Sequence, residues 1–294
     1  MPEAVLIVFS FLIGAVVGSF LNVCVHRLPR GMLLHRPPSH CPFCNEAVRW
    51  YDNVPVASYL ALGRRCRCCG IRISPRYAVL ELVTGAMFAY ITWRLTRGMD
   101  VDYVRLGVYV AVATALAAAS FVDIECRIIP DEISPPGTLL APVVALVWPH
   151  LLLSQGRDHL IVGPLAGLLG ATPASHPHLC SLMTSVAGIA AGFVVVWALG
   201  VMGRLIFRKE AMGFGDVKLM AFVGGFVGWR LVLMTIMVGA CFGAVVGLVS
   251  MARSRDTRMP FGPYLSLGAL VAMLHAGDVV RLFERYAAAV AGAH

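Results

Sequence analysis

Two aspartates stand at the ends of long apolar runs, a position where a charged side chain is costly and usually has a function. Asp123 follows the run YVRLGVYVAVATALAAASFV, and Asp216 precedes another run in MGFGDVKLM. Two carboxylates that share a partly dry site do not both ionise readily, so one holds a proton while the other acts as a base. Aspartyl proteases use such a pair to activate water against a peptide bond. The two residues are therefore candidate catalytic partners, provided that their apolar runs bring them to the same depth.

The residues around Asp216 indicate how a substrate would reach it. Gly213 and Gly215 allow the backbone to bend and to approach a peptide closely, because they carry no side chain. Lys218 either meets substrate and biases the ionisation of the pair, or extends its charge from an apolar segment towards water. We predict that Gly213, Gly215 and Lys218 contribute to the substrate-binding site.

Structural explanations for the same acids stay open at this point. Asp216 is suited to cap a helix that begins at Val217, and Asp123 is suited to end its helix by pairing with Arg127. Asp131, in IIPDEIS, competes with Asp123 for the role of partner. It follows a proline in a loop and is expected to be more exposed, which makes it the weaker candidate.

Five of the nine cysteines crowd into residues 41–69. In CPFC and CRCC, Cys41, Cys44, Cys66 and Cys69 form the pattern C-x2-C-x21-C-x2-C, in which each pair presents two thiolates to one tetrahedral zinc ion. Disulfides and unliganded thiols are the alternatives, and a reducing cytoplasm disfavours the disulfides. Cys68 is a spare that could replace Cys66 or Cys69. We predict a structural zinc site made by the four spaced cysteines.

The segment that holds these cysteines is rich in arginine. Residues 26–76 contain nine arginines against Glu46 and Asp52, a net charge of +7, whereas the whole chain carries +8. Basic connections between membrane spans lie on the cytoplasmic side. Because this rule accounts for the charge, no nucleic-acid partner is expected. Glu81, one turn into the next apolar run, is predicted to pair with Arg76 or with another arginine of the loop.

The composition predicts an all-α polytopic membrane protein with a small zinc-binding cytoplasmic loop domain. Charged residues make up 14% of the chain, against about 25% in soluble domains, and the mean hydropathy is +0.78. About eight apolar runs are candidates to cross a ~30 Å hydrocarbon core. They lie at 4–25, 78–93, 103–122, 138–153, 182–206, 217–229, 231–252 and 261–277, and those at 217–229 and 261–277 are short or interrupted by glycine. The run 159–170 is too short and too rich in proline and glycine, so it is predicted to be a loop.

The first run is interpreted as a retained helix, because it lacks a basic segment before it and a cleavage site after it. The chain then divides into a first transmembrane helix (1–25), a cytoplasmic cysteine- and arginine-rich domain (26–77) and a transmembrane core (78–294). With the second of these inside the cell, eight spans place Asp123 and Asp216 at the same cytoplasmic membrane boundary. That is the depth condition a catalytic pair requires.

An ordered set of motifs supports a more specific interpretation. They are GSFLNVCVHRLP (18–29), CPFC (41–44), NVPVASYL (53–60), RCRCCGIRISPRYAVLEL (65–82), DIECRIIPD (123–131), GFGDVKLM (213–220) and PFGPYLSLGA (260–269). With these motifs, the chain resembles the prepilin leader peptidases of type IV pilus and type II secretion systems, which are membrane aspartyl proteases with a GxGD motif. The resemblance implies that Asp123 and Asp216 are the catalytic aspartates. It also maps the family's tetracysteine motif onto Cys41, Cys44, Cys66 and Cys69.

The resemblance further implies a substrate and a second activity. Members of this family cleave a short basic leader from prepilins and pseudopilins after a glycine, at the cytoplasmic face of the bacterial inner membrane. Many then methylate the new N-terminal amine with S-adenosylmethionine, and members with the cysteine domain are typically bifunctional. Both activities are expected here, with zinc and S-adenosylmethionine as cofactors. The GxG of GFG lacks the βαβ context of a nucleotide site, so no methyl-donor residues are assigned.

Two other classes of function fit part of the pattern. Intramembrane acids commonly line ion paths, so a transporter or channel could use Asp123 and Asp216 for cation or proton passage. A pilus assembly component with a structural zinc loop and no catalysis is the third hypothesis. Cleavage of a prepilin by purified protein separates these classes. Nothing in the sequence indicates an oligomeric state.

Overall fold

The computed structural model describes residues 3–36, 38–97, 101–153, 174–208, 212–253 and 260–291. The chain folds as two compact units, Met1–Cys126 and Arg127–His294. Helices dominate both units, and the described residues contain isolated β-bridges but no extended strand. The predicted loop at 159–170 lies outside the described residues.

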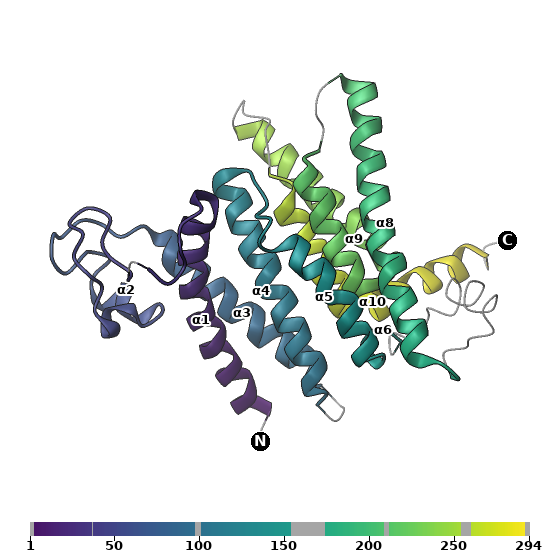
Figure 1. Ribbon diagram of the computed structural model, residues 1–294, viewed down its shortest axis with the longest axis horizontal. Helices are drawn as coiled ribbons and strands as arrows, with labels where there is room; N and C mark the ends of the chain where they lie inside the picture. The colour runs from purple at the N-terminus through teal and green to yellow at the C-terminus, as the bar shows by residue number, and fades with distance from the viewer. Residues whose placement is uncertain are drawn as a thin grey trace. The chain divides into compact units, whose positions relative to one another are not determined.

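Three long helices build the first unit. They are α1 (Glu3–Arg27), α3 (Pro75–Thr96) and α4 (Tyr103–Cys126). Figure 1 shows α1 and α3 side by side, with the long connection between them projecting to one side of α1. α3 begins sharply, because Pro75 has the fixed φ that suits a first helical residue and the Ser74 side chain caps the Arg76 amide.

Helices α1 and α3 run antiparallel and pack closely. The Asn22 side-chain amide donates to the Tyr77 carbonyl near one end of the pair, and the Thr92 hydroxyl donates to Ser10 near the other. Between these contacts, a Cβ added to Gly18 would lie 2.7 Å from the Cα of Glu81. The two backbones approach at a distance that only glycine permits.

The connection between α1 and α3 contains only short helical segments. These are the 3-10 turns η1 (Leu28–Arg30) and η2 (Trp50–Asn53) and the short helix α2 (Ala57–Ala61). Two isolated antiparallel bridges, His40 with Ala47 and Arg65 with Arg72, complete its backbone pairing. A segment with so little regular structure and few large buried side chains needs another source of stability.

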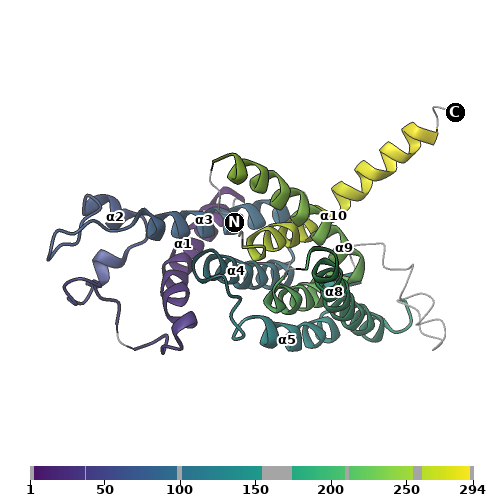
Figure 2. The same ribbon diagram turned by 90° about the horizontal axis from the view of Figure 1, so that it is seen from above.

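The second unit is a helical bundle. Its elements are α5 (Ser134–Val147), α6 (His150–Leu153), α8 (Pro177–Phe207), α9 (Phe214–Arg253) and α10 (Gly262–Ala291). In the views of Figures 1 and 2, α8 and α9 pack along each other, and α5 and α10 also contact α9. Small residues allow this packing: a Cβ on Gly188 of α8 would lie 2.0 Å from the Gly224 carbonyl oxygen of α9. Helix α9 therefore forms the centre of the second unit.

Five described helices are long and apolar enough to cross a membrane. They are Glu3–Arg30, Pro75–Thr96, Tyr103–Cys126, Pro177–Ile206 and Phe214–Ser250, and two shorter apolar helices cover Ser134–Val147 and Gly262–His275. The prediction of an all-α chain with several apolar helices long enough to cross a membrane is confirmed.

One predicted span differs in detail from the structure, and two others meet at a kink. The run expected at 138–153 is broken, since α5 ends at Val147 and Trp148 adopts an extended φ of −123° before Pro149. A proline disfavours the helical conformation in the residue before it. The runs expected separately at 217–229 and 231–252 lie on either side of a kink at Gly228, within the element α9. The Gly228 φ of 78° and ψ of 163° are accessible to glycine and not to other residues.

Candidate functional site

Two matched turns bring the four spaced cysteines together. In the first turn, the Cys41 amide donates to the Glu46 carbonyl and the Asn45 amide donates back to the Cys41 carbonyl. The second turn repeats this pattern 25 residues later: the Cys66 amide donates to Ile71, and the Gly70 amide donates to Cys66. Asn45 and Gly70 both have a positive φ, 55° and 68°, directly after the second cysteine of each turn. Asparagine and glycine are the residues that tolerate this conformation best.

The four sulfur atoms form a compact cluster. Those of Cys41, Cys44, Cys66 and Cys69 all lie within 4.8 Å of one another, with 3.8 Å between Cys41 and Cys69 and 4.0 Å between Cys44 and Cys66. A tetrahedral zinc ion with Zn–S bonds of about 2.3 Å would separate its sulfur ligands by about 3.8 Å. Cys68 is exposed and does not belong to the cluster. The donor set and its spacing therefore fit zinc.

The amides of the first turn also favour the ligand form of Cys41. Hydrogen bonds from the backbone amides of Cys44 and Phe43 lower the pKa of the Cys41 thiol to about 6. The thiolate, rather than the thiol, is the form that binds metal.

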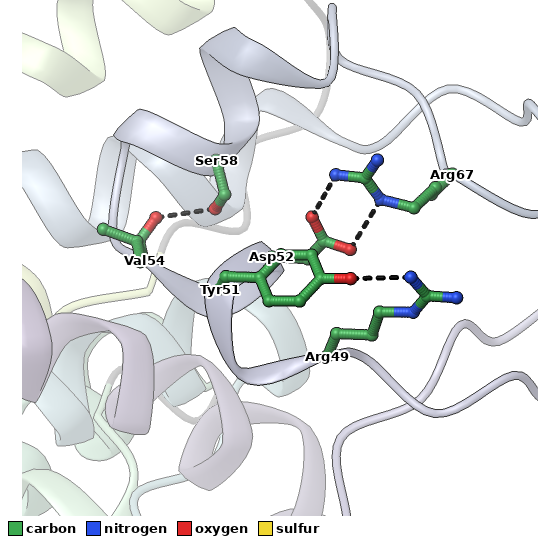
Figure 3. Close-up of polar contacts among 6 residues, drawn as sticks. All are labelled: Arg49, Tyr51, Asp52, Val54, Ser58 and Arg67. Carbon is green, nitrogen blue, oxygen red and sulfur yellow. Dashed lines mark hydrogen bonds and ion pairs between the residues drawn. The ribbon is translucent and has the colours of Figure 1, made fainter.

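A second contact fastens the segment between the two cysteine turns. Figure 3 shows the Arg67 guanidinium donating to both carboxylate oxygens of Asp52, at 2.9 and 2.6 Å. Beside it, Arg49 donates to the Tyr51 hydroxyl at 2.6 Å, and the Ser58 hydroxyl donates to the Val54 carbonyl. The Arg67 bonds lower the pKa of Asp52. Because Arg67 follows Cys66 directly, this fork joins η2 to the second cysteine turn.

Asp216 lies in the first turn of α9 and is buried, with 7% of its surface exposed. Its carboxylate accepts a hydrogen bond from the Gly213 amide at 3.2 Å. An acid at the third helical position that binds the amide before the helix forms half of a capping box. The helix begins at Phe214 and not at Val217. Asp216 therefore caps the helix from its third residue, and not from the position before its first residue. One carboxylate oxygen thus has a fixed place, as a catalytic acid also requires.

The flanking residues have defined contacts. Lys218 forms an ion pair with Asp131, at 2.7 Å from Nζ to Oδ1, and lies 5.2 Å from the centre of the Phe214 ring. A Cβ on Gly215 would lie 3.1 Å from the Cβ of Ile129, whereas Gly213 is exposed. Gly215 therefore lies in close contact with the segment before Asp131. No contact among the described residues bears on a substrate role for Gly213, Gly215 or Lys218.

Asp123 occupies the last turn of α4 and is also buried, at 6% exposure, next to the fully buried Val122. Two residues later, Glu125 forms an ion pair with Arg76 at the start of α3. This pair joins the end of α4 to the start of α3. The prediction that Arg76 pairs with Glu81 is wrong.

Glu81 is held instead by uncharged groups. Its carboxylate accepts a hydrogen bond from the Val56 amide at 2.8 Å and another from the Ser19 hydroxyl of α1. Glu81 lies where Gly18 brings the two helices together, and no ion pair with a loop arginine is found for it among the described residues. Sequence reasoning missed Ser19 as a partner of this acid and Asn22 as a partner of Tyr77, one turn earlier on α3. The signal was present in GSFLNVCVHRLP, where both polar residues lie on one face of an otherwise apolar helix, three positions apart.

Comparison with known proteins covers both units. Residues 12–95 match the family model of the bacterial Peptidase A24 N-terminal domain, and residues 110–248 match that of the Type IV leader peptidase family. The second match contains both Asp123 and Asp216. No solved structure matches the chain.

Curated relatives match over nearly the full length. The prepilin leader peptidase/N-methyltransferase of Pseudomonas aeruginosa is 30% identical over 95% of this chain and 93% of its own length. The protein of the same name from Stutzerimonas stutzeri is 28% identical over 95% of this chain and 93% of its own length. That from Klebsiella pneumoniae is 33% identical over 79% of this chain and 90% of its own length. This multi-pass helical chain, with buried aspartates at two helix ends, thus belongs to the prepilin leader peptidase/N-methyltransferase family.

Proposed function

We propose that this chain cleaves the basic leader from prepilins and pseudopilins with Asp123 and Asp216 as its catalytic pair. The observation that carries the proposal is the burial of both carboxylates at ends of apolar helices, within the stretch that matches the leader peptidase family. Exposed acids would titrate independently at their ordinary pKa, whereas buried carboxylates brought close together share a proton. Of the neighbouring acids, Asp131 is mostly exposed and paired with Lys218, which makes it unsuitable as the partner.

The reaction follows from the two protonation states. The ionised aspartate removes a proton from a water molecule, which attacks the carbonyl carbon after the leader's last glycine. The protonated aspartate donates a hydrogen bond to the carbonyl oxygen, where negative charge develops. The Gly213 amide would hold one oxygen of Asp216 in place during this exchange, because it already donates to Oδ2. Gly213, Gly215 and Lys218 are proposed to line the path of the substrate backbone.

The proposed setting is the bacterial inner membrane, with residues 1–25 as the first span, 26–77 as a cytoplasmic zinc domain and 78–294 as the transmembrane core. Eight spans result if the two shorter apolar helices also cross and if α9 contributes one span on each side of Gly228. Zinc, held by Cys41, Cys44, Cys66 and Cys69, would act as a closed structural site. The N-methyltransferase named in the relatives implies S-adenosylmethionine as the donor for a second reaction on the new N-terminus.

Substitution of the aspartates tests the peptidase. Asp123→Asn and Asp216→Asn should each lower cleavage of a prepilin by purified protein in detergent by at least about 100-fold, because an amide replaces neither the base nor the shared proton. The measurement is the shortened product on a gel, with its mass confirming the cut after glycine. Asp131→Asn is the matched control and should keep cleavage within a few-fold of the unsubstituted chain.

Two results would overturn the proposal. Normal cleavage by both asparagine variants would remove the aspartates from the chemistry. Absence of any cleavage by the unsubstituted chain, together with gradient-driven ion flux in vesicles that depends on Asp123 and Asp216, would establish the transporter instead.

A further inference from the structure

The first unit contains a large cavity that the peptidase reaction does not use. It has a volume of about 1700 Å³, and residues of α1, of α3 and of the loop between them line it. Ligand sites commonly measure about 300–1,000 Å³. The cavity therefore has room for a small molecule together with the end of a peptide.

The wall of this cavity that α1 and α3 form carries hydrogen-bonding side chains. Glu81, Ser19 and Asn22 all line it, and Glu81 and Asn22 are buried, at 9% and 5% exposure. The side-chain nitrogen of Asn22 is committed to the Tyr77 carbonyl, which leaves Oδ1 as the free end of the amide. That oxygen is buried without a hydrogen-bond partner. A buried acceptor without a donor is costly, and in native proteins it commonly awaits a ligand or a water molecule.

The backbone that holds Glu81 is strained. Val56, whose amide donates to the carboxylate, has a φ of 59° and a ψ of −47°. Positive φ in a β-branched residue is unfavourable and persists only where the surroundings enforce it, which occurs most often at functional sites. The same segment lies beside Pro55 and Ser58, which also line the cavity. The strain therefore serves to place one donor on Glu81 while its remaining lone pairs stay available.

The chemistry of this wall selects a cation that carries several N–H donors. A carboxylate and an amide oxygen both accept, and neither offers a proton to an anion. A primary ammonium has three N–H donors that match these acceptors. Glu81 lies six residues after the first residue of α3, about 9 Å along the helix. A primary amine at the end of an apolar peptide segment would reach that depth near the end of a membrane span.

We propose that this cavity is the methylation site and that Glu81, with Asn22, binds the N-terminal amine released by leader cleavage. The proposal rests on the proposed function, since it takes that product as its substrate. Glu81 accepts one proton from the ammonium. The two remaining N–H groups donate to the Asn22 side chain and to the other acceptors of this wall. The nitrogen lone pair then attacks the methyl carbon of a methyl-sulfonium donor in the rest of the cavity. The N–C bond forms, the C–S bond breaks with its electrons on sulfur, and the products are a methylated ammonium and a thioether.

Glu81→Gln tests the assignment with the full-length protein in detergent. Methylation of a synthetic peptide with the mature N-terminus should fall by at least about 100-fold, because glutamine cannot take the proton. Leader cleavage of an intact prepilin should stay within about twofold. Using the mature peptide keeps methylation independent of the peptidase step.

Binding supplies a readout separate from catalysis. The unsubstituted chain should bind the free-amine peptide at least about tenfold more tightly than its N-acetylated form, since a charge-assisted hydrogen bond is lost on acetylation. Glu81→Gln and Asn22→Leu should both reduce this preference. Thr84→Val is the matched control, because Thr84 is fully buried on the same helix and its hydroxyl binds only the Leu80 carbonyl.

The outcomes separate this inference from the proposed function. Unchanged methylation and unchanged amine preference in both variants overturn the site. Equal loss of cleavage and methylation in Glu81→Gln, with a normal unfolding midpoint, assigns Glu81 to the peptidase and also overturns it. If Glu81→Gln does not fold, the Asn22→Leu variant decides: an unchanged preference for the free-amine peptide over its N-acetylated form overturns the site. No cleavage by the unsubstituted chain is a failure of the proposed function and not of this site.

Discussion

At the scale of single residues, the surroundings of each acid decide what it can do. Asp52 has a bidentate arginine, Asp131 has a lysine, and Glu125 has an arginine, so all three are compensated ions. Asp216 and Glu81 instead accept hydrogen bonds from backbone amides in buried positions. Charged partners stabilise the ionised form of an acid, whereas burial disfavours that form and suits an acid to exchange a proton.

Asp52 offers a test of this distinction by pH. Its pKa is lowered, first by the hydrogen bonds from Arg67 and more weakly by the charge of Arg49. The pair therefore stabilises the loop above the unfolded pKa of about 3.9, and this contribution disappears as the pH falls through the lower folded pKa. Carboxyl-carbon NMR of Asp52 should give a midpoint below 3.9. Arg67→Gln should return the midpoint towards the ordinary value, and Arg49→Gln should move it less.

At the scale of helices, glycines set both the packing and the breaks. Gly188 and Gly224 bring α8 against α9, and Gly228 interrupts α9. The part of α9 before this break spans about 21 Å at 1.5 Å per residue, less than the ~30 Å of a hydrocarbon core. Asp216 lies in the first turn of this short segment. The runs predicted at 217–229 and 231–252 are separated by a break at Gly228, because only glycine adopts the required φ and ψ without strain.

Alanine at two glycines of α8 should separate packing from helix propensity. Gly188→Ala places a Cβ 2.0 Å from a backbone oxygen of α9 and should destabilise the protein by about 1–3 kcal/mol, as overpacking does. At Gly200 the nearest atom would lie 3.7 Å away, so Gly200→Ala should be neutral or slightly stabilising. Thermal unfolding in detergent measures both variants. Equal midpoints for the two would contradict the close α8–α9 contact.

At the scale of the whole molecule, the helical units and the cysteine loop have different sources of stability. The long helices bury apolar side chains against one another. The loop between α1 and α3 relies on paired turns, the Asp52 fork and the four clustered thiols. A metal ion would join two turns that are 25 residues apart and would add the free energy of binding to the stability of the loop.

Removal of the metal should therefore act locally. The purified chain should contain about one zinc per molecule, and a strong chelator or Cys41→Ser should remove it. Amide hydrogen exchange in residues 38–73 should then rise sharply, while circular dichroism at 222 nm should change little, because the loop contains only short helices. Cys68→Ser is the matched control and should keep its zinc. Full zinc content in Cys41→Ser would require other ligands.

The sequence by itself determined the class of membrane protein, the cysteine quartet, the acids worth testing and the family resemblance. These follow from local composition and spacing, which a chain displays directly. Only the tertiary structure paired Arg76 with Glu125, Ser19 with Glu81 and Lys218 with Asp131. Such pairs depend on how helices far apart in sequence approach one another. Small residues such as Gly18 fix that approach through close packing, which periodicity does not reveal.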